Sequence, residues 1–446
     1  MKEAHPLEKT LGMELYATDC IGVGGRLKTR YEDFLVEEIT TDNEILSFKE
    51  WLNRPPGEPT LEGKKTKYVS FTVQKMGLST MDVSTIIASS LNLPRNLVSY
   101  AGLKDRRAVT VQRMTAPIRA ASELGTLELS NIEIRDIKHS RQLVQIGDLI
   151  GNRFTILLRD IDASLDKALE VAEEVQSSPL LNYFGVQRFG ISRPNTHIAG
   201  KYLIKRDFEG IIRSILCMPG EYEDKELLDA RAELNDSLTP TEKIIDVFPK
   251  DLHYERTVMD ELMKHPGEFK RAVTRIPPRI LTLMVHAYQS FLFNRLLSKR
   301  VRSGMSYVIP EPGDFLIALD ETHSGRDSWL YVTESTVDER RQQVMDMKYA
   351  LALPSPGYAT HLPPTRQSEM MKEILADEGI TFRDFRDPQM RSIDAPGGFH
   401  RTSITLSDWE ASIQDKGLLV KFSLRKGSYA TVVLRELMKN HPINRI

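Results

Sequence analysis

Apolar and polar residues alternate along this chain with two different periods, and these periods predict where strands and helices lie. Residues 68–73 (YVSFTV) alternate at every second position and are rich in β-branched and aromatic side chains, which predicts a strand. A helix is predicted to begin at Ser79 to Asp82 and to end near Leu91, ahead of Pro94. Further strands are predicted over residues 109–114, 132–137, 154–158 and 418–424.

In other segments the apolar residues recur every three or four positions, which predicts helices. Residues 163–176 are the clearest case, because Asp162 can cap the helix and Pro179 lies just past its end. Further helices are predicted over residues 223–235, 280–297 and 429–438.

The order of these elements indicates the fold class. Strands and helices are mixed irregularly in the first part of the chain, without the steady alternation of a doubly wound parallel fold, so we expect an α+β fold with an antiparallel sheet. From about residue 195 the pattern becomes mainly helical, residues 384–401 are typical of a loop, and a strand pattern returns near residue 418.

Composition and charge narrow the class of protein. A chain of 446 residues suggests two or three domains. The formal net charge of -2 argues against general binding of polyanions, although it permits local basic patches. The two cysteines, Cys20 and Cys217, form no CxxC motif, which disfavours disulfides and fits a reducing cytoplasm.

The sequence predicts a soluble intracellular protein. The first eight residues contain no apolar segment of a signal peptide. The longest apolar stretch, residues 280–293, is interrupted by polar side chains and is too short to cross a bilayer.

Several kinds of chemistry have no signature in the chain. None of the ten histidines is paired with another at the spacing of metal ligands, and there is no phosphate-binding loop and no GxSxG motif. The glycines at positions 22, 24 and 25 are better explained by a turn that leads into a strand than by a dinucleotide site. We therefore expect neither a metal nor a nucleotide cofactor, whereas a carboxylate nucleophile needs no such signature.

Residues 101–112 (AGLKDRRAVTVQ) are the most informative segment. Asp105 stands among Lys104, Arg106 and Arg107, just before a β-branched run. Nearby cations favour the ionised form of a carboxylate, and they can also hold a polyanion above it. An aspartate that caps a turn or pairs with Arg107 at the surface is the structural alternative.

Residues 102–106 (GLKDR) resemble the signature of the TruD family of tRNA pseudouridine synthases. Lys28 and four segments resemble other motifs of this family, in the family's order. These segments are residues 31–38 (YEDFLVEE), 147–154 (GDLIGNRF), 182–190 (NYFGVQRFG) and 427–436 (GSYATVVLRE), with a weaker match at 287–294 (AYQSFLFN).

The resemblance implies a function and a nucleophile. Members of the family isomerise uridine to pseudouridine in tRNA, at position 13 in the D arm, without a cofactor or metal. By this resemblance Asp105 attacks either C1′ of the ribose or C6 of the uracil. Lys28 would be a charge partner of Asp105, and Lys104 would contact phosphate or the reacting carboxylate, unless it is a solvated lysine.

Further residues are expected to hold the substrate. By resemblance Phe154 stacks on a target base that has left the RNA stack, although it could instead be the first core residue of its strand. Asn152 can hold a loop or meet the edge of the uracil. Arg188 can reach phosphate, while Phe184 and Phe189 are expected to lie in the core.

The resemblance also implies the domain organisation. Residues 1–190 and 396–446 would form a pseudouridine-synthase catalytic domain with a central antiparallel sheet, and residues 191–395 a family-specific α/β insertion domain. Clusters of basic residues at 201–213, 270–279 and 299–302 would help to hold the RNA, or would be solvated helix faces. The alternatives are an RNA-binding protein without activity and another base-modifying enzyme, such as a methyltransferase.

Overall fold

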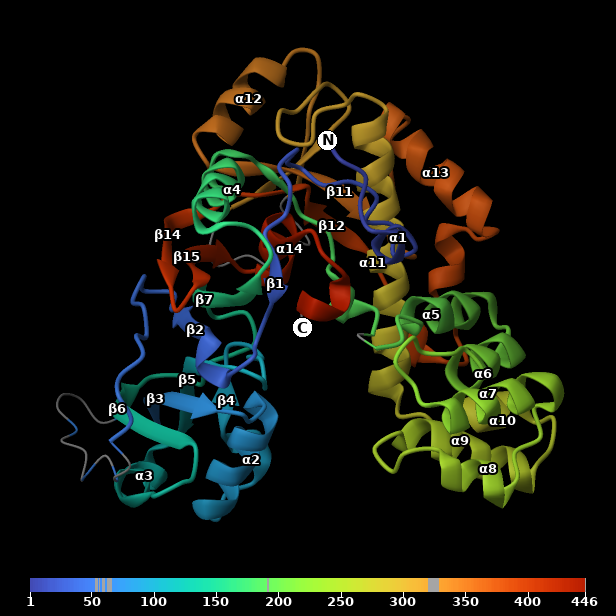
Figure 1. Ribbon diagram of the computed structural model, residues 1–446, viewed down its shortest axis with the longest axis horizontal. Helices are drawn as coiled ribbons and strands as arrows, with labels where there is room; N and C mark the ends of the chain where they lie inside the picture. The colour runs from blue at the N-terminus through green and yellow to red at the C-terminus, as the bar shows by residue number, and fades with distance from the viewer. Residues whose placement is uncertain are drawn as a thin grey trace. The chain divides into compact units, whose positions relative to one another are not determined.

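The computed structural model describes residues 1–52, 55, 57, 61, 66–190, 192–319 and 329–445. These residues form two compact units (Figure 1). Within the described ranges, unit 1 comprises residues 1–17, 181–319 and 329–403, and unit 2 comprises residues 18–180 and 404–445. The short strands β8 (Leu180–Leu181) and β13 (Ser403–Ile404) lie where the chain passes between the units.

A large sheet forms the centre of unit 2. Seven strands follow one another across it, in the order β14 (Ser407–Gln414), β15 (Gly417–Arg425), β7 (Gly151–Ile161), β2 (Phe34–Ile39), β5 (Val109–Pro117), β3 (Tyr68–Met76) and β6 (Ile132–Ser140). The short strands β1 (Gly24–Arg26) and β4 (Ser99–Tyr100) pair with β7 and β5. Neighbouring strands are antiparallel except β2 and β5, which are parallel.

Helix α2 (Thr80–Ser90) shows how local sequence positions the elements of unit 2. Ser79 accepts a hydrogen bond from the backbone N–H of Asp82, whose side chain accepts one from the N–H of Ser79, and this capping box fixes the start of the helix. The buried Val83 and Ile87 belong to the same core as β3. The further helices described in unit 2 are η1 (Tyr31–Asp33), η2 (Arg95–Leu97), η3 (Ile118–Ala120), α3 (Ala121–Thr126), α4 (Leu165–Ser177), α14 (Ala430–Met438) and η7 (Pro442–Arg445).

Unit 1 is mainly helical and is built along α11 (Pro278–Arg302), which buries apolar residues on most of its sides. Its four-stranded sheet has the order β10 (Trp329–Tyr331), β9 (Phe315–Ala318), β11 (Tyr349–Ser355) and β12 (Gly398–Arg401). The other described helices are α1 (Pro6–Lys9), η4 (Val186–Arg188), α5 (Thr196–Lys205), α6 (Phe208–Leu216), α7 (Lys225–Ser237), α8 (Glu242–Val247), α9 (His253–Lys264), α10 (Phe269–Val273), α12 (Val337–Met345), α13 (Arg366–Glu378), η5 (Phe382–Phe385) and η6 (Arg391–Ile393).

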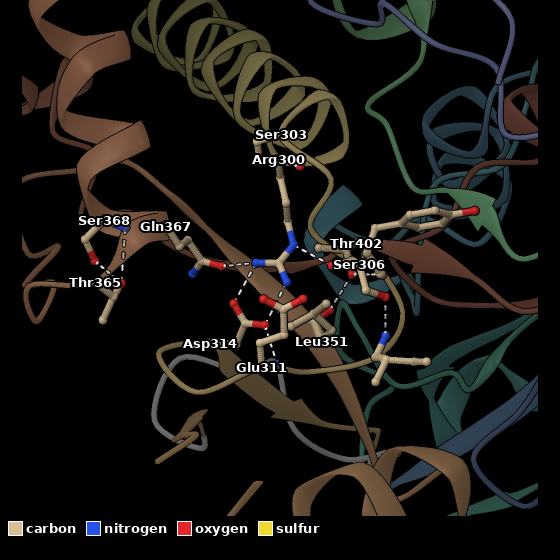
Figure 2. A network of polar contacts seen from close by, with 12 residues as sticks. Arg300, Ser303, Ser306, Glu311, Asp314, Leu351, Thr365, Gln367, Ser368 and Thr402 are labelled. Carbon is tan, nitrogen blue, oxygen red and sulfur yellow. Dashed lines mark hydrogen bonds and ion pairs between the residues drawn. The ribbon is translucent and has the colours of Figure 1, made fainter. Parts of the chain in front are cut away.

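A buried arginine joins three segments of unit 1 (Figure 2). The guanidinium of Arg300 donates to both carboxylate oxygens of Asp314, at 2.6 and 2.7 Å, and to Oε1 of Gln367 at 2.9 Å. Arg300 lies in the last turn of α11, Asp314 precedes β9 and Gln367 belongs to α13. A fork of this kind is a strong and directional contact. It accounts for one member of the basic cluster at 299–302, which lies in the core and is not available to RNA.

The predicted α+β fold agrees with this structure, and three details of the prediction need correction. The central sheet contains one parallel pair, β2 and β5. Ser164 caps α4, in place of the expected Asp162. The expected loop at 384–401 contains the edge strand β12, which is paired with β11.

The units also divide the chain differently from the predicted domains, which grouped residues 1–190 with 396–446. The first 17 residues and residues 181–190 belong to unit 1, because they pack on α11. Ser298 donates to the carbonyl of Gly12, and Asn294 donates to the carbonyl of Leu11. Of the helices described, none has the length and apolar character that crossing a membrane requires.

Candidate active site

The parallel strands β2 and β5 bring Lys28 and Asp105 together. Leu35 near the start of β2 is paired with Val109, which begins β5. The starts of two parallel neighbours lie at the same edge of a sheet, so the segments that lead into them meet. Nζ of Lys28 accordingly lies 3.4 Å from Oδ1 of Asp105.

The two partners of this ion pair differ in exposure. The side chain of Asp105 is 49% exposed and that of Lys28 only 9%. The ammonium of Lys28 also lies 4.4 Å from the centre of the Phe34 ring, a cation–π contact that helps to fix it. The structure therefore presents a carboxylate that is accessible from solvent and is held by a buried cation.

Lys104 points away from solvent, although it is the next residue in the sequence. Its Nζ lies 2.7 Å from Oε2 of Glu38, and both side chains are buried. The other oxygen of Glu38 accepts a hydrogen bond from the backbone N–H of Arg113. This placement corrects two expectations, because Lys104 is neither a solvated lysine nor placed to contact phosphate. Glu38 therefore has a structural role.

Buried polar side chains hold the backbone of the segment around Asp105. Nζ of Lys75 donates to the carbonyl of Asp105 at 2.8 Å. Oγ1 of Thr80 accepts from the N–H of Lys104 at 2.8 Å, and Nε2 of Gln112 donates to the carbonyl of Gly102 at 3.3 Å. Sequence reasoning missed all three of these side chains. Burial lowers the pKa of Lys75 to about 8, while the charge of Asp105 acts in the opposite direction.

Phe154 lies in a row of aromatic rings on β2, β7 and β15. Its ring is stacked on Phe422, with centres 5.5 Å apart, and it meets Phe34 edge-on at 6.2 Å. Phe34 in turn contacts Lys28, so three successive contacts connect Phe154 to Asp105. Phe154 is 7% exposed. It therefore contributes to the core, as the alternative interpretation expected, and the ring of Phe34 links it to the ion pair.

Asn152 lies on the same face of the central sheet as Phe154. The register places Asn152 opposite Glu38 and Phe154 opposite Val36, and directly paired residues of neighbouring strands share a face. Within the described part of the chain, the amide oxygen of Asn152 is buried and has no hydrogen-bond partner. Buried acceptors are nearly always satisfied, so this oxygen is suited to a donor from outside the chain.

A hollow of about 660 Å³ lies between α2, η2 and the loop that follows β6. Its lining includes Arg95, Asn96 and Tyr100, and Tyr100 is five residues from Asp105. The carbonyl of Ala101 accepts from the N–H of Gly147, which joins the start of the Asp105 segment to the loop that lines the hollow. The hollow offers an aromatic ring, a cation and an amide, the groups with which proteins recognise single-stranded RNA.

Arg188 belongs to unit 1, where its Nε donates to Oγ of Ser290 at 3.4 Å. The arrangement around Asp105 is thus built from unit 2 alone, and a role for Arg188 stays a prediction. Phe189 is fully buried, which confirms that it belongs to the core, whereas Phe184 is partly buried and packs on Phe293 against that core.

Many of the basic residues that were expected to hold RNA are paired within unit 1. These ion pairs are Lys201 with Glu378, Arg206 with Asp387, Arg213 with Glu209, Arg271 and Arg275 with Glu261, Lys299 with Glu373, and Arg302 with Glu3 and Glu14. These pairs favour the alternative of structural and solvated helix faces for the residues named, and a role of the clusters in holding RNA stays a prediction. Across the described ranges, no three His, Cys, Asp or Glu side chains are grouped so as to hold a metal ion.

The sequence as a whole was compared with protein families and known structures. Residues 10–437 match the family model for tRNA pseudouridine synthase D (TruD). A Methanosarcina acetivorans protein described as a probable tRNA pseudouridine synthase D is 31% identical, over 99% of this chain and 98% of its own. A Thermococcus onnurineus protein with the same description is also 31% identical, over 96% and 97%.

A solved structure agrees with this match. The crystal structure of a Methanosarcina mazei protein, whose description likewise names tRNA pseudouridine synthase D (TruD), superposes with a TM-score of 0.80. The two sequences are 28% identical, and the match covers 99% of this chain and 100% of the other. Because the family model, the relatives and the fold agree over nearly the whole length, this chain belongs to the TruD family.

Proposed function

We propose that this protein isomerises a uridine in tRNA to pseudouridine, with Asp105 as the nucleophile. The observation that carries the proposal is the accessible carboxylate of Asp105, held 3.4 Å from the ammonium of Lys28 within the family's signature segment. Membership of the TruD family supports the substrate class and the reaction. The target at position 13 of the D arm is part of the proposal.

The reaction leaves the atomic composition of the uridine unchanged. The bond between N1 and C1′ breaks, a bond between C5 and C1′ forms, and the hydrogen on C5 leaves as a proton while N1 gains one. Asp105 begins this sequence by attacking either C1′ of the ribose or C6 of the uracil. No electrons are transferred to or from the substrate, so the chemistry requires no redox partner.

The ion pair with Lys28 supplies two conditions that such a nucleophile needs. The ammonium of Lys28 lies 3.4 Å from Oδ1 of Asp105, so it is a donor aimed at the reacting group. Lys28 itself is fixed by burial and by the ring of Phe34, so it also restricts the position of the carboxylate. Orienting a reacting group before the reaction removes part of its entropic cost.

The surroundings of the ion pair are suited to bind a base that has left the RNA stack. A base inside a helix cannot present C5 and C6 to a side chain, so enzymes of this kind extrude it. Phe154 is an aromatic ring linked to the pair through Phe34, and the unpaired amide oxygen of Asn152 suits the N3–H of uracil. The hollow lined by Arg95 and Tyr100 is suited to neighbouring parts of the RNA.

The Asp105→Asn variant tests the proposal. Release of tritium from tRNA labelled at C5 of uridine measures the turnover, and mapping of pseudouridine in the product locates the target. We expect Asp105→Asn to release no tritium while binding tRNA with nearly unchanged affinity. Asp166→Asn, an exposed aspartate in the first turn of α4, is the matched control and should retain full activity.

The same measurements separate the alternatives. Full turnover by Asp105→Asn would overturn the role of this carboxylate. If the wild-type protein binds tRNA but releases no tritium, a binding protein without activity is favoured. A methyltransferase would increase the mass of the tRNA, whereas isomerisation to pseudouridine leaves the mass unchanged.

A further inference from the structure

Lys75 is a fully buried lysine on β3 whose ammonium ends at the backbone of Asp105. Its Nζ donates to the carbonyl of Leu78 at 2.7 Å and to the carbonyl of Asp105 at 2.8 Å. Leu78 follows the end of the same strand, so Lys75 clamps its own chain to the segment that carries the nucleophile. Lysine is very seldom fully buried in proteins, which indicates that this position has a special requirement.

The register of the sheet explains why Lys75 reaches this segment. Lys75 is paired with Thr110, and Thr110 is paired with Val36 on the parallel strand β2. These residues therefore lie on the face of the sheet that also carries Asn152 and Phe154. Gln74, the preceding residue, is also fully buried. Its side chain points to the opposite face of the sheet, where its Nε2 donates to the carbonyl of Lys49.

Lys75 acts together with Thr80 and Gln112. Oγ1 of Thr80 accepts from the N–H of Lys104 and donates to Oε1 of Gln112 at 2.9 Å, and the amide of Gln112 holds the carbonyl of Gly102. The three side chains thus fix the backbone at residues 102, 104 and 105. The bonds that reach the segment 102–105 all involve its backbone, so the carboxylate of Asp105 is left for Lys28 and for a substrate.

The charges that face the ammonium of Lys75 come from two other elements. Asp105 and Lys104 belong to the segment before β5, and Asp82 belongs to α2. The residues paired with Lys75 on β5 and β6, Thr110 and Ile132, are uncharged. Burial and Lys104 disfavour the charged form of Lys75, whereas Asp105 and Asp82 favour it, and the resulting pKa of about 8 leaves Lys75 mostly charged at neutral pH.

We propose that Lys75 is a positioning residue for the reaction: its ammonium holds the carbonyl of Asp105 and thereby aims the carboxylate of Asp105 at the substrate. This inference rests on the proposed function of Asp105. A neutral donor could satisfy the same carbonyl at a lower cost of desolvation. A charged donor makes a stronger bond to the carbonyl, and its charge also faces the side chain that reacts.

The comparison of Lys75→Met with Gln74→Met tests the proposal. Both variants replace a fully buried polar side chain by methionine on neighbouring positions of one strand. Each also removes hydrogen bonds: Lys75→Met loses those to the carbonyls of Leu78 and Asp105, and Gln74→Met loses those to Lys49, Glu133 and Arg135. We expect Lys75→Met to lower kcat for tritium release by about ten- to a hundredfold, with KM for tRNA nearly unchanged. Gln74→Met should change kcat much less, even where its melting temperature falls as far.

Two further measurements do not depend on that comparison. Hydrogen exchange of the amides of residues 102–107 should be faster in Lys75→Met than in Gln74→Met, because only the first variant releases this segment. The wild-type kcat should decline on the alkaline side of about pH 8, where Lys75 loses its charge, and Lys75→Met should lack this decline. If Lys75→Met does not fold, Thr80→Val serves in its place for kcat and exchange, because it removes the bond to the N–H of Lys104.

The outcomes separate this inference from the proposed function. A wild-type protein that forms no pseudouridine contradicts the proposed function. An active wild-type protein whose folded Lys75→Met variant keeps the wild-type kcat and exchange rates overturns only the role of Lys75. The role is also overturned if Gln74→Met loses as much kcat as Lys75→Met, because the loss would then reflect a general loosening of β3.

Discussion

Lys104 and Asp105 are neighbours in the sequence, yet the side chain of Lys104 is 3% exposed and that of Asp105 is 49% exposed. Lys104 turns into the sheet toward Glu38, and this anchor lets the next residue turn outward toward Lys28. The backbone between them is held by Lys75 and Thr80. The exposed carboxylate of Asp105 is thus carried by a backbone segment that is anchored on both sides of the peptide bond to its buried neighbour.

Lys104→Met should destabilise unit 2 through the charge that it leaves behind. Removal of one partner from a buried ion pair typically costs about 3–5 kcal/mol, because the other charge stays buried and uncompensated. Chemical denaturation of Lys104→Met should show a loss of this size. The double variant Lys104→Met, Glu38→Gln should recover part of it. Equal losses in the single and double variants would contradict this account of the pair.

Lys28→Met should lower kcat by about tenfold or more, because the contact of a charged donor with the carboxylate of Asp105 is lost. The backbone of Lys28 has a φ of 52°, in the left-handed region. This conformation is as unfavourable for methionine as for lysine, so the substitution adds no backbone strain. Lys28→Arg keeps the charge and should restore most of the rate. Wild-type tritium release by Lys28→Met would show that Asp105 needs no partner at this position.

Phe154 is expected to contribute to both stability and rate, and two substitutions separate these contributions. Phe154→Ala should destabilise the protein by about 3–5 kcal/mol, because it opens a cavity between Phe34 and Phe422. Phe154→Leu keeps much of the apolar volume but has no ring. If a base stacks on Phe154, the folded Phe154→Leu protein should still lose activity. Full activity of that variant would assign Phe154 to the core alone.

The sequence was sufficient to identify the elements whose signals are local. The capping box of Ser79 and Asp82 marks the start of α2, and the alternation over residues 68–73 marks β3. Asp105 was recognised from a short motif that needs no knowledge of the fold. In each case the signal lies within a few residues of the feature that it predicts.

The parts of the site that depend on distant pairing could not be predicted in this way. The parallel pairing of β2 with β5 joins segments about seventy residues apart, and nothing in either strand specifies its partner. Lys75 and Gln112 stand within strands, where polar residues usually face solvent, yet both are fully buried because the segment around Asp105 covers them. A buried polar residue is distinguished from a solvated one only when the covering segment is known.

The stability of unit 1 should fall with decreasing pH because of His197. This side chain is packed against Phe189 and Phe291, and burial lowers its pKa to about 4 from the usual 6.5. The unfolded chain therefore binds a proton between pH 6.5 and 4 that the folded chain does not bind. The contribution of His197 is complete above pH 6.5 and is lost as the pH falls toward 4.

The size of this effect can be measured against a variant that does not titrate. One group with these two pKa values loses about 2 kcal/mol between pH 7.5 and pH 5. Urea denaturation of the wild type and of His197→Leu at both pH values should show the wild type losing more stability than the variant by about this amount. Other acid-sensitive groups are common to both proteins, so they cancel in the comparison. An equal pH dependence in the two proteins would mean that His197 accepts its proton in the folded state as readily as in the unfolded chain, which its enclosure by two aromatic rings argues against.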